Sequence, residues 1–158
     1  DKRIIDLGGL SLTTRLDRVD MLNDERPIII DYKTGGSKIT TMRGERPDEP
    51  QLPLYLLASQ SDAASAVVFA QVKMGEMKFK ALARDSDLLP SVKADSEWEQ
   101  LIVSWRTDLT RIAESFSKGD AKVSPKKYPE TCRNCDLEPF CRISERTEDA
   151  YAESEDGA

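Results

Sequence analysis

Two aspartates and a lysine near the start of the chain are the residues whose types and spacing best suit a chemical reaction. Asp31 and Lys33 close the apolar run 28–30, and Asp17 stands earlier, after a stretch of alternating leucines. Alternate residues of a strand share one face, so Asp31 and Lys33 point to one side and Tyr32 to the other. If the segment around Asp17 pairs with this strand as a hairpin, two carboxylates and an ammonium group converge.

These three side chains would suit hydrolysis of a phosphodiester. Two carboxylates supply hard oxygen ligands for Mg²⁺ or Mn²⁺, ions that keep several waters and accept phosphate oxygens. A nearby lysine can position or deprotonate a metal-bound water and neutralise the charge that builds on a phosphate. The alternative is a surface hairpin in which Lys33 makes an ordinary ion pair with an aspartate.

The Asp-x-Lys pattern is not specific by itself, because it occurs by chance at ordinary composition. The segment 120–122 (DAK) is a second instance, and 76–78 (EMK) is a conservative variant. Asp31 differs from both because three isoleucines precede it. That run indicates a buried strand whose last residues emerge at a sheet edge.

The elements that must position these residues follow from hydrophobic periodicity. Residues 9–22 alternate as in a half-buried strand, 23–26 form a turn signal and 28–30 resemble a central strand, which together predict a hairpin. The segment 35–50 is rich in glycine, proline and charge and predicts a loop of about 15 residues. Residues 50–60 have helical spacing, with Pro53 tolerated in the first turn.

The second half of the chain predicts two more strands and a long helix. Segments 66–74 and 78–83 form a strand pair that turns at 75–76, and 98–116 has the spacing of an amphipathic helix that ends near Gly119. Trp98 and Trp105 are expected in the core rather than in a cofactor or base-stacking site. An irregular alternation of strands and helices predicts an α/β domain with one mixed sheet flanked by helices.

Composition narrows the class of protein. The chain has 158 residues, of which 39% are hydrophobic and 33% charged, and this favours one compact domain over 1–143. No apolar run approaches the roughly 20 residues that cross a bilayer, and the sequence contains no basic-then-apolar segment of the kind that forms a leader. The absence of histidine excludes mechanisms that need an imidazole from this chain.

The net charge of −6 is unevenly distributed. Residues 144–158 contain six acids and one base, which leaves only −1 for residues 1–143. An acidic chain argues against a nucleic-acid partner, but this near-neutral body removes most of that objection. We expect 144–158 to be a disordered, solvated tail.

Three cysteines, Cys132, Cys135 and Cys141, lie within ten positions. An odd number in one cluster is a poor disulfide framework and fits a reducing cytoplasm. Cys-x2-Cys places two thiolates in one tight turn, a spacing used by zinc ribbons and by iron–sulfur clusters. Three buried, unligated thiols are the remaining alternative.

Four segments together resemble a known family. LDRVD at 16–20, IDYKTG at 30–35 and QLPLY at 51–55 resemble, in order and spacing, three motifs of the RecB/AddB-type nuclease domain of the PD-(D/E)xK superfamily. The cysteine group at 132–141 resembles the C-terminal cysteine group of AddB-type members, and the middle of the chain matches only in element order. The resemblance implies a restriction-endonuclease-like core, with a central mixed β-sheet flanked by helices.

The resemblance also implies roles for the residues of the first two motifs. Asp17 and Asp31 would bind Mg²⁺ or Mn²⁺, and the backbone carbonyl of Tyr32 would be a further ligand. Lys33 would be the catalytic lysine.

The third motif and the cysteine group carry further implied roles. Gln51 and Tyr55 match a Gln-x3-Tyr motif that would contact DNA beside the site, with helix capping and packing as the alternative. The cysteines would hold a [4Fe–4S] cluster as a structural staple, which needs a fourth ligand.

The chain departs from this family's pattern in one respect. Members usually carry a preceding helical segment that supplies the fourth cysteine and often a histidine, and neither residue is present here. We therefore expect the N-terminal part of the domain to be missing, which would leave an incomplete cluster and could leave the fragment inactive. A water, a carboxylate or a neighbouring chain as fourth ligand is the alternative.

The sequence thus predicts a metal-dependent DNA nuclease domain of a helicase-linked repair or recombination protein. We expect an exonuclease that acts on single-stranded ends in the cytoplasm, with a helicase module or subunit as partner and no contact with a membrane. A catalytically inactive DNA-binding or scaffold module is the main alternative, and a zinc-stapled interaction domain is a weaker one.

Overall fold

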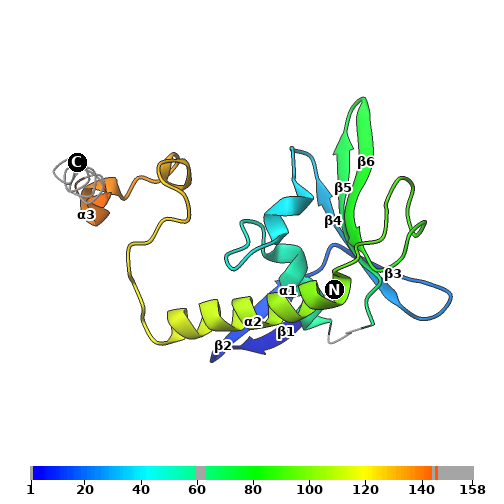
Figure 1. The fold of residues 1–158 in the computed structure, drawn as a ribbon, viewed down its shortest axis with the longest axis horizontal. Helices are drawn as coiled ribbons and strands as arrows, with labels where there is room; N and C mark the ends of the chain where they lie inside the picture. Colours follow the sequence, from blue (N-terminus) through cyan, green and yellow to red (C-terminus); the bar gives the residue numbers. More distant parts are fainter. Residues whose placement is uncertain (1, 60–62, 144, 146–158) are drawn as a thin grey trace, which may run out of the picture. The chain divides into compact units, whose positions relative to one another are not determined.

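The chain divides into two compact units, one ending at Gly119 and one beginning at Asp120. The computed structural model describes residues 2–59, 63–143 and 145. Figure 1 shows a sheet with helices beside it in the first unit, and short helices joined by turns in the second. Each unit is described by itself below.

The first unit is built on a four-stranded sheet in the order β3-β4-β5-β6. Its strands are β3 (Arg18–Met21), β4 (Pro27–Lys33), β5 (Ala66–Lys73) and β6 (Glu76–Ala83). The β4/β5 pair is parallel, whereas β3/β4 and β5/β6 are antiparallel, so the sheet is mixed. The predicted mixed sheet is confirmed, as are the hairpin around 23–26 and the turn at Gly75.

β4 lies inside the sheet because its isoleucines are buried on both faces. Ile29 is fully buried on one face together with Val67 of β5. Ile28 and Ile30 are buried on the other face against two alanines and one valine of β5, Ala66, Ala70 and Val68. A β-branched run that is apolar on both sides suits a central strand, as the sequence predicts.

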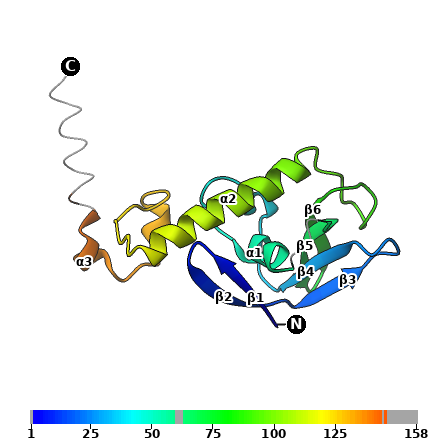
Figure 2. The ribbon, with the colours of Figure 1, turned by 90° about the horizontal axis from the view of Figure 1, so that it is seen from below.

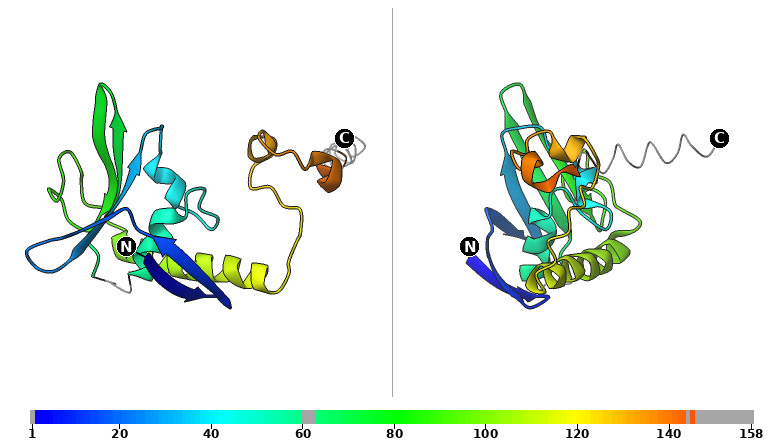
Figure 3. Two further views of the ribbon diagram at one scale, coloured as in Figure 1. Left: turned by 180° about the vertical axis from the view of Figure 1, so that it is seen from behind. Right: turned by 90° about the vertical axis from the view of Figure 1, so that its left-hand side faces the viewer.

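Helices α1 (Gln51–Ala58) and α2 (Trp98–Ser117) cover one face of this sheet, as Figures 2 and 3 show. α1 is the crossover between the parallel strands β4 and β5, and it contacts both strands and α2. Trp98 and Trp105 are buried and meet edge to face, with ring centroids 6.3 Å apart. The Trp105 indole also donates a 2.7 Å hydrogen bond to the Met42 carbonyl. The predicted core role of both tryptophans is confirmed.

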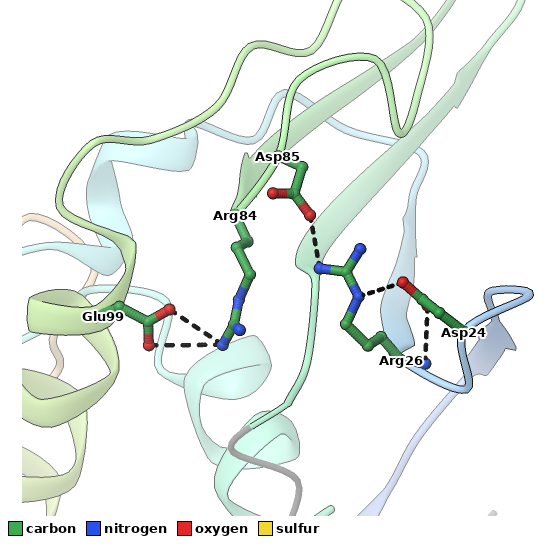
Figure 4. A network of polar contacts seen from close by, with 5 residues as sticks. All are labelled: Asp24, Arg26, Arg84, Asp85 and Glu99. Atoms are coloured by element: carbon green, nitrogen blue, oxygen red, sulfur yellow. Dashed lines mark hydrogen bonds and ion pairs between the residues drawn. The ribbon is translucent and has the colours of Figure 1, made fainter.

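The other face of the sheet is partly covered by the segment that joins β6 to α2. Val92, with Leu88 and Leu89, packs there against Ile28 and Ile30. Figure 4 shows the ion pairs at this end of the unit: Arg26 bonds Asp24 and Asp85, and Arg84 bonds Glu99 of α2. Exposed pairs of this kind add little stability each, so the apolar contacts hold the segment in place.

Four details differ from the predictions. A strand β1 (Lys2–Leu7) pairs with β2 (Leu10–Arg15) in a separate two-stranded sheet. The predicted strand over 9–22 is therefore broken at 16–17, where the chain passes from one sheet to the other. The predicted loop contains the short helix η1 (Ile39–Met42). Phe116, expected on the apolar face of α2, is 71% exposed because it lies beyond the last core contact of the helix, Ala113.

The second unit contains the short helices η2 (Glu130–Cys132) and α3 (Glu138–Cys141). The Cys135 N–H donates a 3.0 Å hydrogen bond to the Cys132 carbonyl, so these two cysteines share a tight turn. No disulfide joins the three cysteines. The predicted tail, apart from Glu145, lies outside the described residues. No helix among the residues described here is long and apolar enough to span a membrane.

The β1–β2 turn provides a test of the fold. Gly8 has φ +54°, and a Cβ there would lie 2.5 Å from the Glu114 nitrogen and 2.6 Å from the Thr110 carbonyl oxygen. We expect Gly8→Ala to lower the free energy of unfolding in urea by about 2 kcal/mol or more, through backbone strain and steric conflict with α2. Gly36→Ala, whose Cβ would meet nothing within 4 Å, is the matched control. Equal stability of the two variants would contradict this packing.

Candidate active site

The β3–β4 hairpin brings Asp17 beside the end of β4. Arg18 pairs with Ile30 as the last register pair, so the preceding residue, Asp17, comes opposite Asp31. The Tyr32 N–H donates a 3.2 Å hydrogen bond to Asp17 Oδ2. Asp17 is exposed and lies in the bend between β2 and β3. Its carboxylate is thus held by the main chain of the neighbouring strand.

Asp31 is a buried carboxylate at the centre of this arrangement, with only 2% of its surface exposed. Lys33 Nζ lies 2.9 Å from Asp31 Oδ2, yet that oxygen accepts no well-directed hydrogen bond from the described residues. Burial raises the pKa of the Asp31 carboxyl above its ordinary value, Lys33 opposes this rise, and the charge of Asp17 adds to it. The site therefore favours a cation beyond the one that Lys33 provides.

Lys33 links the end of β4 to the first helix. Its Nζ donates a 3.0 Å hydrogen bond to Gln51 Oε1 and lies 5.3 Å from the ring centroid of Phe69. The Gln51 amide nitrogen is 2.6 Å from the Tyr55 hydroxyl, one turn along α1. An ammonium group only donates, so the Gln51 amide presents its oxygen to Lys33 and its nitrogen to Tyr55.

The five predicted side chains lie in one continuous set of contacts. From Asp17 the set runs through the Tyr32 main chain to Asp31, and then through Lys33 and Gln51 to Tyr55. The structure brings these residues together, while their catalytic and substrate-binding roles stay predictions.

The Tyr32 side chain points to the face of β4 opposite to Asp31 and Lys33, as the strand period requires. Its side chain is 46% exposed, and its hydroxyl accepts a 3.1 Å hydrogen bond from Arg18. In a strand, the N–H and carbonyl of one residue point to the same side. The Tyr32 carbonyl therefore faces the same edge as the N–H that holds Asp17, where the sequence places a metal ligand.

The pair Asp17 and Asp31 fits a hard divalent cation. Among the described residues, no group of three or more histidine, cysteine or acidic side chains could hold a metal ion. Mg²⁺ needs less than that, because it is commonly bound through one or two carboxylates together with waters and substrate phosphates. The feature that supports this fit is the buried Asp31 carboxyl, whose Oδ2 lies 2.9 Å from Lys33 Nζ but accepts no well-directed hydrogen bond within the described part of the chain. The cysteine side chains, by the same measure, do not form a metal-binding group as they stand.

Two residues of β5 border the site and were not predicted from the sequence. Phe69 is in register with Asp31, and Gln71 is in register with Lys33. Both are buried, and Gln71 Oε1 lacks a hydrogen-bond partner within the described part of the chain. Phe69 and Gln71 are two positions apart in the predicted strand over 66–74, so the strand period alone places them on one face. Their approach to Asp31 depends on the parallel β4/β5 pairing, which no local pattern specifies.

A match to a family model agrees with this fold. The family model of the PD-(D/E)XK nuclease superfamily matches residues 2–142. With the mixed sheet and its flanking helices, this match confirms the predicted restriction-endonuclease-like core. No curated protein matches the chain. The solved structure described as "Crystal structure of SSO0001" is similar at 16% identity and a TM-score of 0.44, covering 89% of this chain. This chain spans 56% of the length of that one.

The raised pKa of Asp31 predicts how stability depends on pH. The folded protein binds the Asp31 proton more tightly than the unfolded chain does, so this carboxyl stabilises the fold at low pH. That contribution is lost as pH rises from about 3.9, the ordinary aspartate pKa, through the raised value. In the absence of divalent metal, we expect Asp31→Asn to remove this loss, so that its free energy of unfolding falls less than that of the wild type as the pH rises from 4 to 7.

Urea denaturation at a series of pH values between 4 and 7 measures this effect. Asp6→Asn is the matched control, because it removes the same charge from an exposed position of β1. We expect this control to have the stability of the wild type at pH 7. A less stable Asp31→Asn protein with an unchanged pH dependence would contradict the prediction.

Proposed function

We propose that this chain, which belongs to the PD-(D/E)XK nuclease superfamily, hydrolyses phosphodiester bonds of DNA with the help of a divalent metal ion. The observation that carries the proposal is the convergence of Asp17, Asp31 and Lys33 at the end of β4. Two carboxylates, one of them buried, beside a single ammonium group are a costly arrangement for structure alone, because the buried charge has lost its hydration. It is well suited to binding a cation and a phosphate together.

The residues have distinct roles in this proposal. Asp17 and Asp31 would hold Mg²⁺ or Mn²⁺, with the Tyr32 carbonyl as a further ligand, and the ion would polarise a phosphate oxygen and acidify a bound water. Lys33 orients the attacking water and neutralises the charge that develops on the phosphate. Its ammonium group can also hold or release a proton at Nζ.

Gln51 and Tyr55 complete the site from α1. Gln51 fixes the direction of the Lys33 ammonium through its carbonyl oxygen, and Tyr55 fixes the amide of Gln51. The Gln51 side chain lies beside Lys33, where a bound strand would pass, and Tyr55 lies behind it, 7% exposed. We propose that they also contact the substrate next to the scissile phosphate.

The finer parts of the proposal rest on the resemblance of the three motifs to RecB/AddB-type nucleases. They are exonucleolytic cleavage of single-stranded ends, a place in a helicase-linked repair or recombination protein, and a cytoplasmic location. Exposure of Asp17 at the edge of the sheet supports access by a strand end. DNA binding without cleavage would instead favour the scaffold alternative.

We further propose that the cysteine group binds an iron–sulfur cluster. The tight turn from Cys132 to Cys135 and the Cys-x2-Cys spacing support ligation. The side chains do not converge on one point in the structure, so ligation would require them to move. It would also need a fourth ligand besides Cys132, Cys135 and Cys141.

Removal of the lysine tests the enzymatic proposal. We expect Lys33→Ala to lower the rate of Mn²⁺-dependent cleavage of a single-stranded oligonucleotide by about 10²- to 10³-fold, because the transition state loses its cationic partner. Lys38→Ala, an exposed lysine of the following loop, is the matched control and should cleave at the wild-type rate. Equal rates in Lys33→Ala and the wild type, or no cleavage by the wild type, would overturn the proposal.

Anaerobic reconstitution with iron and sulfide tests the cysteine proposal. We expect the wild type to gain visible absorption with stoichiometric iron and sulfide, and Cys135→Ser to lose most of it because one thiolate is removed. Lys33→Ala keeps all three cysteines and serves as the control that should retain the absorption. Binding of zinc in preference to iron, or of neither metal, would contradict the iron–sulfur assignment.

A further inference from the structure

Three lysines share one face of the β5–β6 hairpin. In register, Lys73 pairs with Glu76, Gln71 with Lys78, and Phe69 with Lys80. Residues that pair directly across an antiparallel ladder point to the same side, and residues two apart along a strand do as well. Lys73, Lys78 and Lys80 therefore lie on the side that carries Phe69. We call these three residues the lysine face.

The charges of all three lysines act on one carboxyl of the same face, that of Glu76. The Glu76 carboxyl has its pKa lowered first by a hydrogen bond from Lys78 and also by the charges of Lys73 and Lys80. Three lysines around one glutamate give a local net charge of +2 in a chain whose net charge is −6. This surface has the opposite sign to the protein as a whole.

The lysine face continues directly from the candidate site. Lys33 lies over Phe69, so it is on the same side of the sheet as the lysine face. It is in register with Gln71, which is in register with Lys78. Neighbouring strands are about 4.8 Å apart, which places the Lys78 backbone about 10 Å from that of Lys33. Lys80 reaches back toward the loop after β4 and donates a hydrogen bond to the Ser37 carbonyl.

The opposite face of the same hairpin has a different character. Val72, Met77 and Phe79 point to that side and are 47%, 79% and 40% exposed. The charges of the hairpin are thus segregated onto the face that leads to Lys33, rather than scattered over both sides.

We propose that the lysine face binds the sugar–phosphate backbone of the single DNA strand whose scissile phosphate occupies the site at Asp31 and Lys33. This inference rests on the proposed function and adds the path of the substrate. Lysine ammonium groups bind phosphates as point charges and release counterions. Such contacts hold a strand in register without reading its bases, so binding here is independent of sequence.

The double variant Lys73→Gln/Lys78→Gln tests this path in the full chain. We expect the KM for a single-stranded oligonucleotide to rise about tenfold with kcat within about twofold, because backbone contacts contribute to binding and not to the bond cleavage. Loss of two phosphate contacts should also reduce the slope of log affinity against log salt by about 1.4.

Two measurements separate this inference from the proposed function. Lys93→Gln/Lys118→Gln removes the same charge from two exposed lysines elsewhere in the unit and should keep the KM and the salt slope of the wild type. Lys33→Ala with an intact hairpin should still bind the oligonucleotide, with a salt slope lower by only about 0.7 for its one lost phosphate contact, while its cleavage rate falls as predicted above.

The outcomes distinguish the two ideas. If the wild type cleaves DNA but the hairpin variant keeps its KM and salt slope, the inference is wrong and the proposed function stands. The lysines then serve only to keep the edge strand β6 from pairing with other strands. If the wild type neither binds nor cleaves DNA, the proposed function itself fails.

Discussion

The ion pair between Lys33 and the buried Asp31 connects the elements of the first unit at one point. Burying this pair costs a large desolvation free energy, because the Asp31 carboxylate is only 2% exposed and has lost most of its contact with water. The pair is kept in place because Lys33 also meets Gln51 of α1 and the ring of Phe69 on β5. Each of three elements therefore contributes one contact to the same ammonium group. Lys33 does not fully offset the burial of the Asp31 carboxylate, since the pKa of Asp31 is still raised. A metal ion would supply the further positive charge.

The topology of the sheet explains why these contacts occur at the end of β4. A parallel pair of strands requires a crossover, and α1 provides it between β4 and β5. The crossover returns over the face that carries Ile29 and Asp31, so the first residue of α1, Gln51, comes beside Lys33. The antiparallel hairpin adds Asp17 from the other side of β4. The antiparallel hairpin from β3 and the helical crossover to β5 thus both place residues around the end of β4.

Local patterns were sufficient for the parts of the site that depend on neighbouring residues. The period of two placed Asp31 and Lys33 together, and the turn at 23–26 brought Asp17 opposite them. The contributions of Phe69 and Gln71 could not be predicted, because the parallel pairing joins segments separated by a loop and a helix. The break at 16–17 was missed for a related reason. The alternation over 10–16 ends there, but no local pattern shows that the pairing partner changes from β1 to β4. The roles of the site residues and the extent of the domain over 1–143 stay predictions.

The hydrogen bond from Trp105 to the Met42 carbonyl has an effect on the site although α2 contributes no residue to it. The chain between Lys33 and Gln51 is anchored at Met42, which is fully buried beneath α2. The anchor divides one long loop into two shorter ones, 33–42 and 42–51. A shorter loop loses less conformational entropy when its ends are held together. The hydrogen bond from the Trp105 indole therefore restricts, from outside the site, the positions that the start of α1 can take relative to the end of β4.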